Sequence, residues 1–118
     1  MGNQEKGKTG EVLAEAYLLK QGYEILRRRY RCQWGENDII AKLGETLCFV
    51  EVKARKSTRY GYGAEAVTLK KMRSAILAAQ SYLQLHPYDG EIRFDVMEVD
   101  LNSQEVRHII GAFDASAL

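Results

Sequence analysis

Three residues of this 118-residue chain have types and spacing suited to phosphodiester chemistry: Asp38, Glu51 and Lys53. Twelve residues separate the two acids, and one residue separates Glu51 from the lysine. Two neighbouring carboxylates repel each other, and Mg²⁺ (or Mn²⁺) relieves this by binding them together with waters and phosphate oxygens. A nearby lysine stabilises charge on a phosphate or holds an attacking water. The pattern predicts a metal site at Asp38 and Glu51, with Lys53 as a catalytic group in metal-assisted phosphodiester hydrolysis.

A β-hairpin is needed to bring these groups together. We predict strands over residues 37–43 and 47–54, the clearest strand signals in the chain. If Gly44-Glu45 forms the centre of a type II′ turn, Asp38 lies directly opposite Glu51. Directly opposed side chains have Cβ atoms about 4.5–5.5 Å apart, so the two carboxylates are expected within reach of one ion.

The two faces of this hairpin differ in character. Lys53 shares the face of Glu51, because side chains two residues apart point the same way, and the opposite face is apolar, with Cys48, Val50 and Val52. In one alternative the acids lie on a solvated sheet face, where charges are common, and Lys53 neutralises one of them. The apolar residues around Glu51 instead favour a covered strand, and a buried acidic pair is more often functional.

The remaining elements predict an α/β fold. We expect the order α-β-β-β-α-β-β, with a central mixed sheet flanked by helices, in a single domain over residues 1–118. The long helix carries an apolar stripe of Leu69, Met72, Ile76, Ala79 and Leu83 and ends near His86-Pro87. The other expected elements are a helix over 9–21 and strands over 23–30, 92–99 and 105–110.

Composition sets limits but does not indicate a ligand. The chain has 17 basic and 16 acidic side chains, a net charge of +1, so any case for nucleic-acid binding depends on where the charges lie. No apolar run approaches the roughly 20 residues of a membrane span, and the polar N-terminus does not resemble a signal peptide. The two cysteines form no CxxC pair, which favours the cytoplasm and reduced thiols.

Three basic segments are candidates for binding nucleic acid. Arg27, Arg29 and Arg31 occur close to Trp34, a mixture suited to phosphate contacts and base stacking; the alternative is an edge strand protected by charge. Arg55, Lys56 and Arg59 belong to a glycine-containing loop, residues 55–63, that follows Lys53 directly; the alternative is a plain solvated loop.

The third segment is the start of the long helix. Lys70 lies in its first turns, where a cation is unfavourable unless a phosphate is received there. That argument weakens if the helix begins earlier, near Glu65.

Several of these motifs resemble a known superfamily. Gly35-Glu36-Asn37-Asp38-Ile39-Ile40-Ala41, followed by Phe49-Val50-Glu51-Val52-Lys53-Ala54-Arg55, resembles the PD-(D/E)xK nucleases, and more closely the YraN family of small bacterial proteins, which is related to Holliday junction resolvases. Gly10-Glu11, Gly22-Tyr23, Gly61-x-Gly63 and Arg93-Phe94-Asp95-Val96 extend the resemblance over nearly the whole chain.

The resemblance implies a restriction endonuclease-like core and assigns roles by position. Asp38 and Glu51 match the metal-binding acids, Lys53 the catalytic lysine, and Glu11 the helix glutamate that resolvase-like members add to the site. Read without the resemblance, Glu11 is an ordinary acid in the first helical turn. Asn37 stands where the family has an apolar residue, and the superfamily's proline before the aspartate is absent. Glu36 is either an outer metal ligand or a strand-end contact.

Three functions follow as competing hypotheses. The first is a nuclease for branched or structured DNA, and action on a junction is consistent with a homodimer. The second is a nucleic-acid-binding module of a repair or uptake complex, without cleavage of its own. The third is an interaction domain with relic acids, which the intact set of Asp38, Glu51 and Lys53 argues against.

Overall fold

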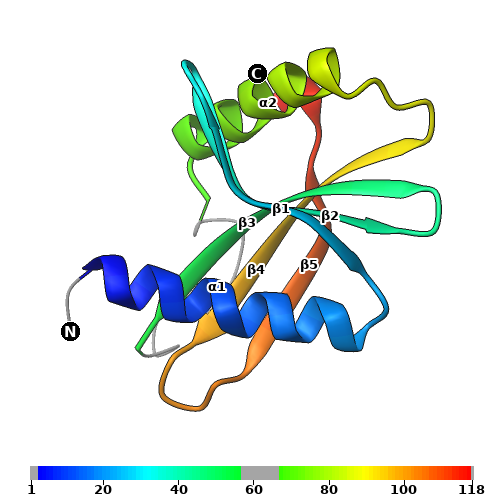
Figure 1. The fold of residues 1–118 in the computed structure, drawn as a ribbon. Coiled ribbons are helices and arrows are strands. Elements are labelled where there is room, and N and C mark those ends of the chain that lie inside the picture. Colours follow the sequence, from blue (N-terminus) through cyan, green and yellow to red (C-terminus); the bar gives the residue numbers. More distant parts are fainter. Residues whose placement is uncertain (1–2, 57–66, 118) are drawn as a thin grey trace.

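The chain folds into a mixed five-stranded sheet with two long helices (Figure 1). The computed structural model describes residues 3–56 and 67–117, so Arg59 and the Gly61-x-Gly63 motif lie outside the described residues. The elements in order are α1 (Asn3–Lys20), β1 (Glu24–Cys32), β2 (Gly35–Leu43), β3 (Thr46–Arg55), α2 (Leu69–Leu85), β4 (Glu91–Asp100), β5 (Val106–Phe113) and a short 3₁₀ helix (Ala115–Ala117).

The strand order in the sheet follows the chain order, β1-β2-β3-β4-β5. Neighbouring strands are antiparallel except β3 and β4, which are parallel and are joined through α2. A parallel pair needs such a crossover, because a tight turn can only reverse the chain direction. The predicted α/β class and the order α-β-β-β-α-β-β are confirmed.

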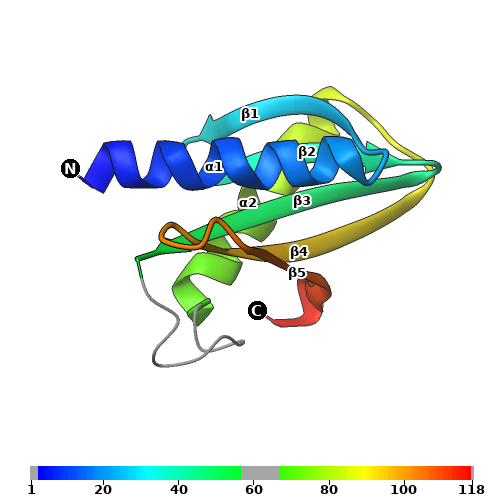
Figure 2. The same cartoon turned by 90° about the horizontal axis from the view of Figure 1, so that it is seen from below.

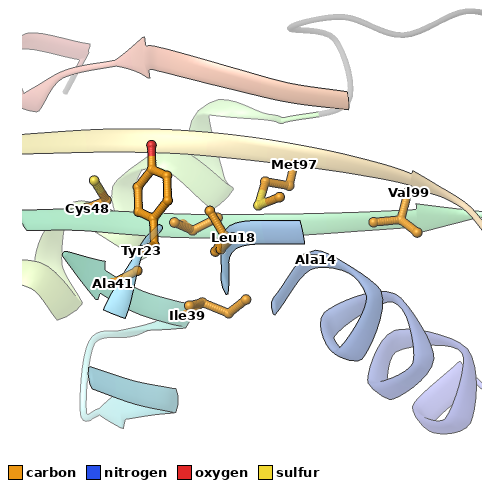
Figure 3. Packing of buried hydrophobic residues seen from close by; sticks show 9 residues of the cluster. Ala14, Leu18, Tyr23, Ile39, Ala41, Cys48, Met97 and Val99 are labelled. Carbon is orange, nitrogen blue, oxygen red and sulfur yellow. The ribbon is translucent and has the colours of Figure 1, made fainter. Parts of the chain in front are cut away.

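Each face of the sheet carries its own apolar core, and Figure 2 shows the helices that cover these faces, α1 in front of the strands and α2 behind them. On one face, Ala14 and Leu18 of α1 pack against alternate residues of the central strands, and Figure 3 shows this cluster from close by. On the other face, Ile76, Ala79 and Tyr82 of α2 pack with residues that include Ile40 and Phe49. The sheet is therefore covered on both sides, and a charged side chain on either face near a helix is withdrawn from water.

Helix α1 begins earlier than predicted, at Asn3 rather than Thr9. The first residues are polar and include Gly7, so no apolar periodicity marks this part of the helix. The expectation that Glu11 lies in the first helical turn was therefore wrong: about two turns of helix precede it. Close packing of α1 on β3 explains the glycine at position 10, because a Cβ there would lie 2.5 Å from the Cβ of Ala54.

Among the helices within residues 3–56 and 67–117, none combines the length and the apolar character needed to cross a membrane.

Candidate functional site

The β2–β3 hairpin has the predicted register. Leu43 pairs with Thr46, and the ladder continues to Ile39 opposite Val50. Gly44 has a positive φ of 59° while Glu45 does not, which agrees with a type II′ turn with glycine first. The predicted apolar face is also confirmed, since Cys48 and Val50 are buried in the α1 core.

Next to the Ile39–Val50 pair, the side chain of Asp38, and not the β2 backbone, binds the backbone of β3. The amide of Val52 donates a hydrogen bond of 2.7 Å to Oδ2 of Asp38. The Asp38 carboxyl group is thereby fixed against the β3 backbone, next to Glu51. The sheet opens at this point, and the two acids meet through their side chains.

Asp38 and Glu51 form a hydrogen-bonded carboxyl pair. Only 6% of Glu51 is exposed, and burial followed by the charge of Asp38 raises the pKa of Glu51 to about 9. Burial also raises the pKa of Asp38, although the Val52 amide partly opposes this. Two adjacent buried carboxyl groups cannot both ionise without a compensating cation, so at neutral pH the metal-free pair retains a proton.

This donor set fits a hard divalent cation. Carboxylate oxygens, with waters and phosphate oxygens, are the ligands that Mg²⁺ takes in enzymes that act on phosphates. Within the part of the chain that the structure describes, no group of three or more His, Cys, Asp or Glu residues is arranged to hold a metal. The acid pair is the unit that could bind such a cation, by losing its retained proton.

Lys53 lies on β3 two residues beyond Glu51, and it is exposed. Its Cα pairs with that of Glu98 on β4. In the described ranges Lys53 forms no ion pair with Asp38 or Glu51, so the alternative in which it neutralises one of the acids does not hold in this structure.

Glu11 faces Asp38 from α1, in a pocket of about 340 Å³ that both residues line. Oε1 of Glu11 accepts a hydrogen bond of 2.9 Å from Nε of Arg29, and the neighbouring Glu15 binds Arg28. The negative charge of Glu11 contributes to the raised pKa of Asp38. The charge of Glu11 therefore reaches Asp38, and the site role that the resemblance implies for Glu11 stays a prediction.

Glu51 opens into a different pocket, of about 450 Å³. Its walls come from the end of the β1–β2 hairpin and the first turns of α2, and they include Arg31, Glu36, Lys70 and Lys71. Helix α2 begins at Leu69, with Thr68 as the N-cap, so the alternative start near Glu65 does not hold. Lys71, in the first turn of α2, is the cation whose charge lowers the pKa of Glu51, against the larger effect of burial.

The remaining predicted basic residues are dispersed. Arg27 lies over the ring of Tyr30, at 5.2 Å from its centroid, and Arg31 forms a 3.0 Å ion pair with Glu36. Glu36 is thus a contact at the strand end that also reaches the Glu51 pocket. Arg55 ends β3, and the backbone carbonyl of Lys56 accepts a hydrogen bond from the Asn102 side chain.

Asn37 is fully buried and has a clear structural effect. Its Nδ2 donates a 3.0 Å hydrogen bond to the carbonyl of Ala75 in α2, while its Oδ1 has no partner within the described residues. Asn37 therefore ties β2 to α2 immediately before Asp38.

A second buried carboxyl group, Asp95 on β4, lies on the α1 face of the sheet and is fully inaccessible. Both of its oxygens accept hydrogen bonds of 2.9 Å from Arg93, and His108 and the Gly111 amide complete its shell at 2.7 and 2.9 Å. Burial alone would raise the pKa of Asp95, but these partners outweigh it and lower the pKa below the ordinary value. The predicted Arg93-Phe94-Asp95-Val96 motif thus forms a structural ion-pair network.

Comparison with known proteins gives a consistent result. The model of the Uncharacterised protein family UPF0102 matches residues 10–99. A UPF0102 protein of Clostridioides difficile is 44% identical over 114 residues, which cover 96% of this chain and all of that protein. UPF0102 proteins of Caldicellulosiruptor saccharolyticus (47% identical, 86% of this chain and 87% of that protein) and Nitrobacter winogradskyi (46%, 93% and 92%) are similar over most of their length.

Proposed function

The chain belongs to the UPF0102 (YraN) family, and on that premise we propose that it is a divalent-metal-dependent nuclease of the PD-(D/E)xK superfamily. Its substrate is DNA, including branched or structured DNA. The observation that carries this proposal is the hydrogen-bonded pair of half-buried Asp38 and buried Glu51, held at the end of the β2–β3 pairing beside a basic pocket. A buried acid pair without a cation costs stability, and a catalytic role for the bound metal accounts for its retention.

Each residue has a part in the reaction. Asp38 and Glu51 would hold Mg²⁺ or Mn²⁺, which supplies Lewis-acid stabilisation of the phosphate and a more acidic bound water. Lys53, exposed on β3 two residues beyond Glu51, would stabilise charge on the phosphate or orient the attacking water. Glu11 adds negative charge on the α1 side, and Lys70 and Lys71 attract the phosphate backbone to the Glu51 pocket.

The proposal also covers the cellular location and the oligomeric state. We place the protein in the cytoplasm, where Cys32 and Cys48 remain free thiols. A homodimer would supply the two matching sites that cleavage of both strands at a junction requires.

A cleavage assay tests the proposal. Branched and linear DNA are incubated with the protein in Mg²⁺, Mn²⁺ or EDTA, and metal-dependent products are expected. Lys53→Ala should lower the rate by about 10²–10⁴-fold, and Asp38→Asn or Glu51→Gln should lower it at least as much. Lys42→Ala is the matched control, because Lys42 lies on the same hairpin but over the ring of Tyr88.

Two outcomes contradict the nuclease. DNA binding without cleavage under every metal condition would support the binding module of a repair or uptake complex instead. Unchanged metal affinity of Asp38→Asn and Glu51→Gln, measured by calorimetry, would show that the metal site lies elsewhere.

A further inference from the structure

Trp34, the only tryptophan of the chain, is 63% exposed at the turn between β1 and β2. The other large hydrophobic side chains exposed in the described residues are all aliphatic. A solvent-exposed indole is a broad, flat surface that gains energy from stacking on another ring.

The turn that carries Trp34 is fixed against α2, as Figure 1 shows for the cyan turn beside this helix. Gly35 approaches α2 so closely that a Cβ there would lie 2.0 Å from the carbonyl oxygen of Ser74. The next amide, of Glu36, donates a 3.1 Å hydrogen bond to Oγ of Ser74, and Asn37 binds the carbonyl of Ala75. The indole is therefore presented from an anchored support, which lowers the entropy lost when it binds a ligand.

Trp34 belongs to a turn whose neighbouring residues line the candidate site. Cys32 and Gly35, on either side of the turn, line the same pocket as Glu51. Trp34 precedes Asp38 by four residues, which is about 13 Å of extended strand. That length corresponds to about four stacked nucleotides of B-form DNA, and to fewer in an extended strand.

The arginines of β1, close to Trp34 in the chain, add little uncompensated charge for binding a duplex. The net charge is +1, and Arg28, Arg29 and Arg31 of β1 are each paired with a glutamate. Binding to the phosphate backbone needs many unpaired cations. Stacking on an aromatic ring adds affinity for each base and needs no cation. A base can stack on Trp34 only if its face is free, which is the case for unpaired bases and for the last pair of a duplex but not for bases inside a duplex.

We propose that Trp34 is a base-stacking platform, and that the substrate of the acid pair is DNA with unpaired nucleotides next to the cleaved phosphate rather than intact duplex. This inference rests on the proposed nuclease function, because it places DNA across the Glu51 pocket. Trp34 acts as a positioning residue and takes no part in the chemical step.

The test is a binding experiment in EDTA, so that it does not depend on cleavage. Labelled oligo-dT and a blunt-ended DNA duplex of matched length are titrated with wild-type protein, Trp34→Ala and Trp34→Phe, with anisotropy as the readout. Trp34→Ala should weaken oligo-dT binding about 5- to 150-fold, and Trp34→Phe should retain most of the affinity, because it retains a ring. In the wild type, oligo-dT should also quench the tryptophan fluorescence, and the duplex should not.

Leu85→Ala is the matched control, because Leu85 is 68% exposed at the other end of α2. Equal oligo-dT affinity of wild type and Trp34→Ala, or an equal loss in Leu85→Ala, would overturn the inference. Quenching by the duplex as strong as that by oligo-dT would overturn the substrate class. Loss of metal-dependent cleavage alone would contradict the nuclease and leave the stacking result standing.

Discussion

Two buried carboxyl sites lie on adjacent strands of the same sheet, and their surroundings are opposite. Asp95 on β4 pairs in register with Val50, the residue directly before Glu51 on β3. Asp95 has a guanidinium, an imidazole and a backbone amide around it, and its pKa is lowered. Glu51 has another acid as its nearest partner, and its pKa is raised to about 9.

The difference separates a structural acid from a functional one. A buried charge with a complete set of donors belongs to the fold, and removing it leaves its partners uncompensated. Two adjacent buried acids cannot both be ionised without a nearby cation, and a divalent ion supplies the compensating charge. The four predictions below test this distinction, from the largest expected effect to the smallest.

Asp95→Ala should lower the free energy of unfolding by about 3–5 kcal/mol, because Arg93 and His108 lose their buried partner. Urea denaturation at neutral pH measures this loss. Glu51→Gln serves as the comparison and should not destabilise the metal-free protein. If Glu51→Gln cost as much as Asp95→Ala, both acids would be structural and the distinction would fail.

Divalent metal should stabilise the wild type through the acid pair. At a free Mn²⁺ concentration about 100 times Kd, the free energy of unfolding should rise by about 2.7 kcal/mol, because only the folded state holds the site. Calorimetry in buffers of different ionisation enthalpy should detect proton release, since the cation replaces the proton of the pair. Glu51→Gln should lose both effects, whereas Asp114→Asn, at an exposed carboxyl group, should keep them. Equal stabilisation of both variants would place the metal elsewhere.

The pH dependence of stability should have opposite signs at the two sites. Between the ordinary pKa of glutamate, 4.5, and about 9, the folded protein keeps a proton on Glu51 that the unfolded chain releases. Stability of the metal-free protein should therefore fall as pH rises through this window, by at most about 1.4 kcal/mol per pH unit. Asp95, with its lowered pKa, instead contributes stability that is lost as pH falls below its ordinary value of 3.8.

Urea denaturation in EDTA from pH 5 to 9 measures the first effect. Glu51→Gln should flatten the profile and exceed the wild type in stability at pH 8 by about 1 kcal/mol or more. A profile that rises with pH in the wild type would contradict the assignment of a shared proton to the pair.

The sequence predicted the hairpin well, because a glycine-led turn and alternating apolar residues set its register locally. It also predicted that Asp38 and Glu51 lie together, but the strand pairing ends at Ile39 and Val50, and the contact depends on the Asp38 side chain, which accepts a hydrogen bond from the Val52 amide. The environment of Asp95 was not predictable from local sequence. Arg93, which binds Asp95, is also bound to Tyr23, and Tyr23 lies 70 residues before Arg93 in the chain. The start of α1 was missed because its polar, glycine-containing first turns have no apolar stripe, and contacts of Gly10 and Gly35 with distant backbone leave no local signal.

The smallest predicted effect concerns Lys71, whose charge lowers the pKa of Glu51 while burial raises it by more. Lys71→Ala removes this influence, so the pH at which Mn²⁺ binding is half-maximal should rise by roughly 0.2–0.7 pH units. The direction follows because a higher pKa of Glu51 makes its proton harder to displace. Calorimetric titrations at several pH values measure the midpoint, with Lys42→Ala, on the far part of the hairpin, as the control. A midpoint that falls, or an equal rise in Lys42→Ala, would mean that α2 does not tune the acid pair. A rise confined to Lys71→Ala would place the first turn of α2 in the electrostatic control of metal binding, a control that the fully compensated Asp95 does not need.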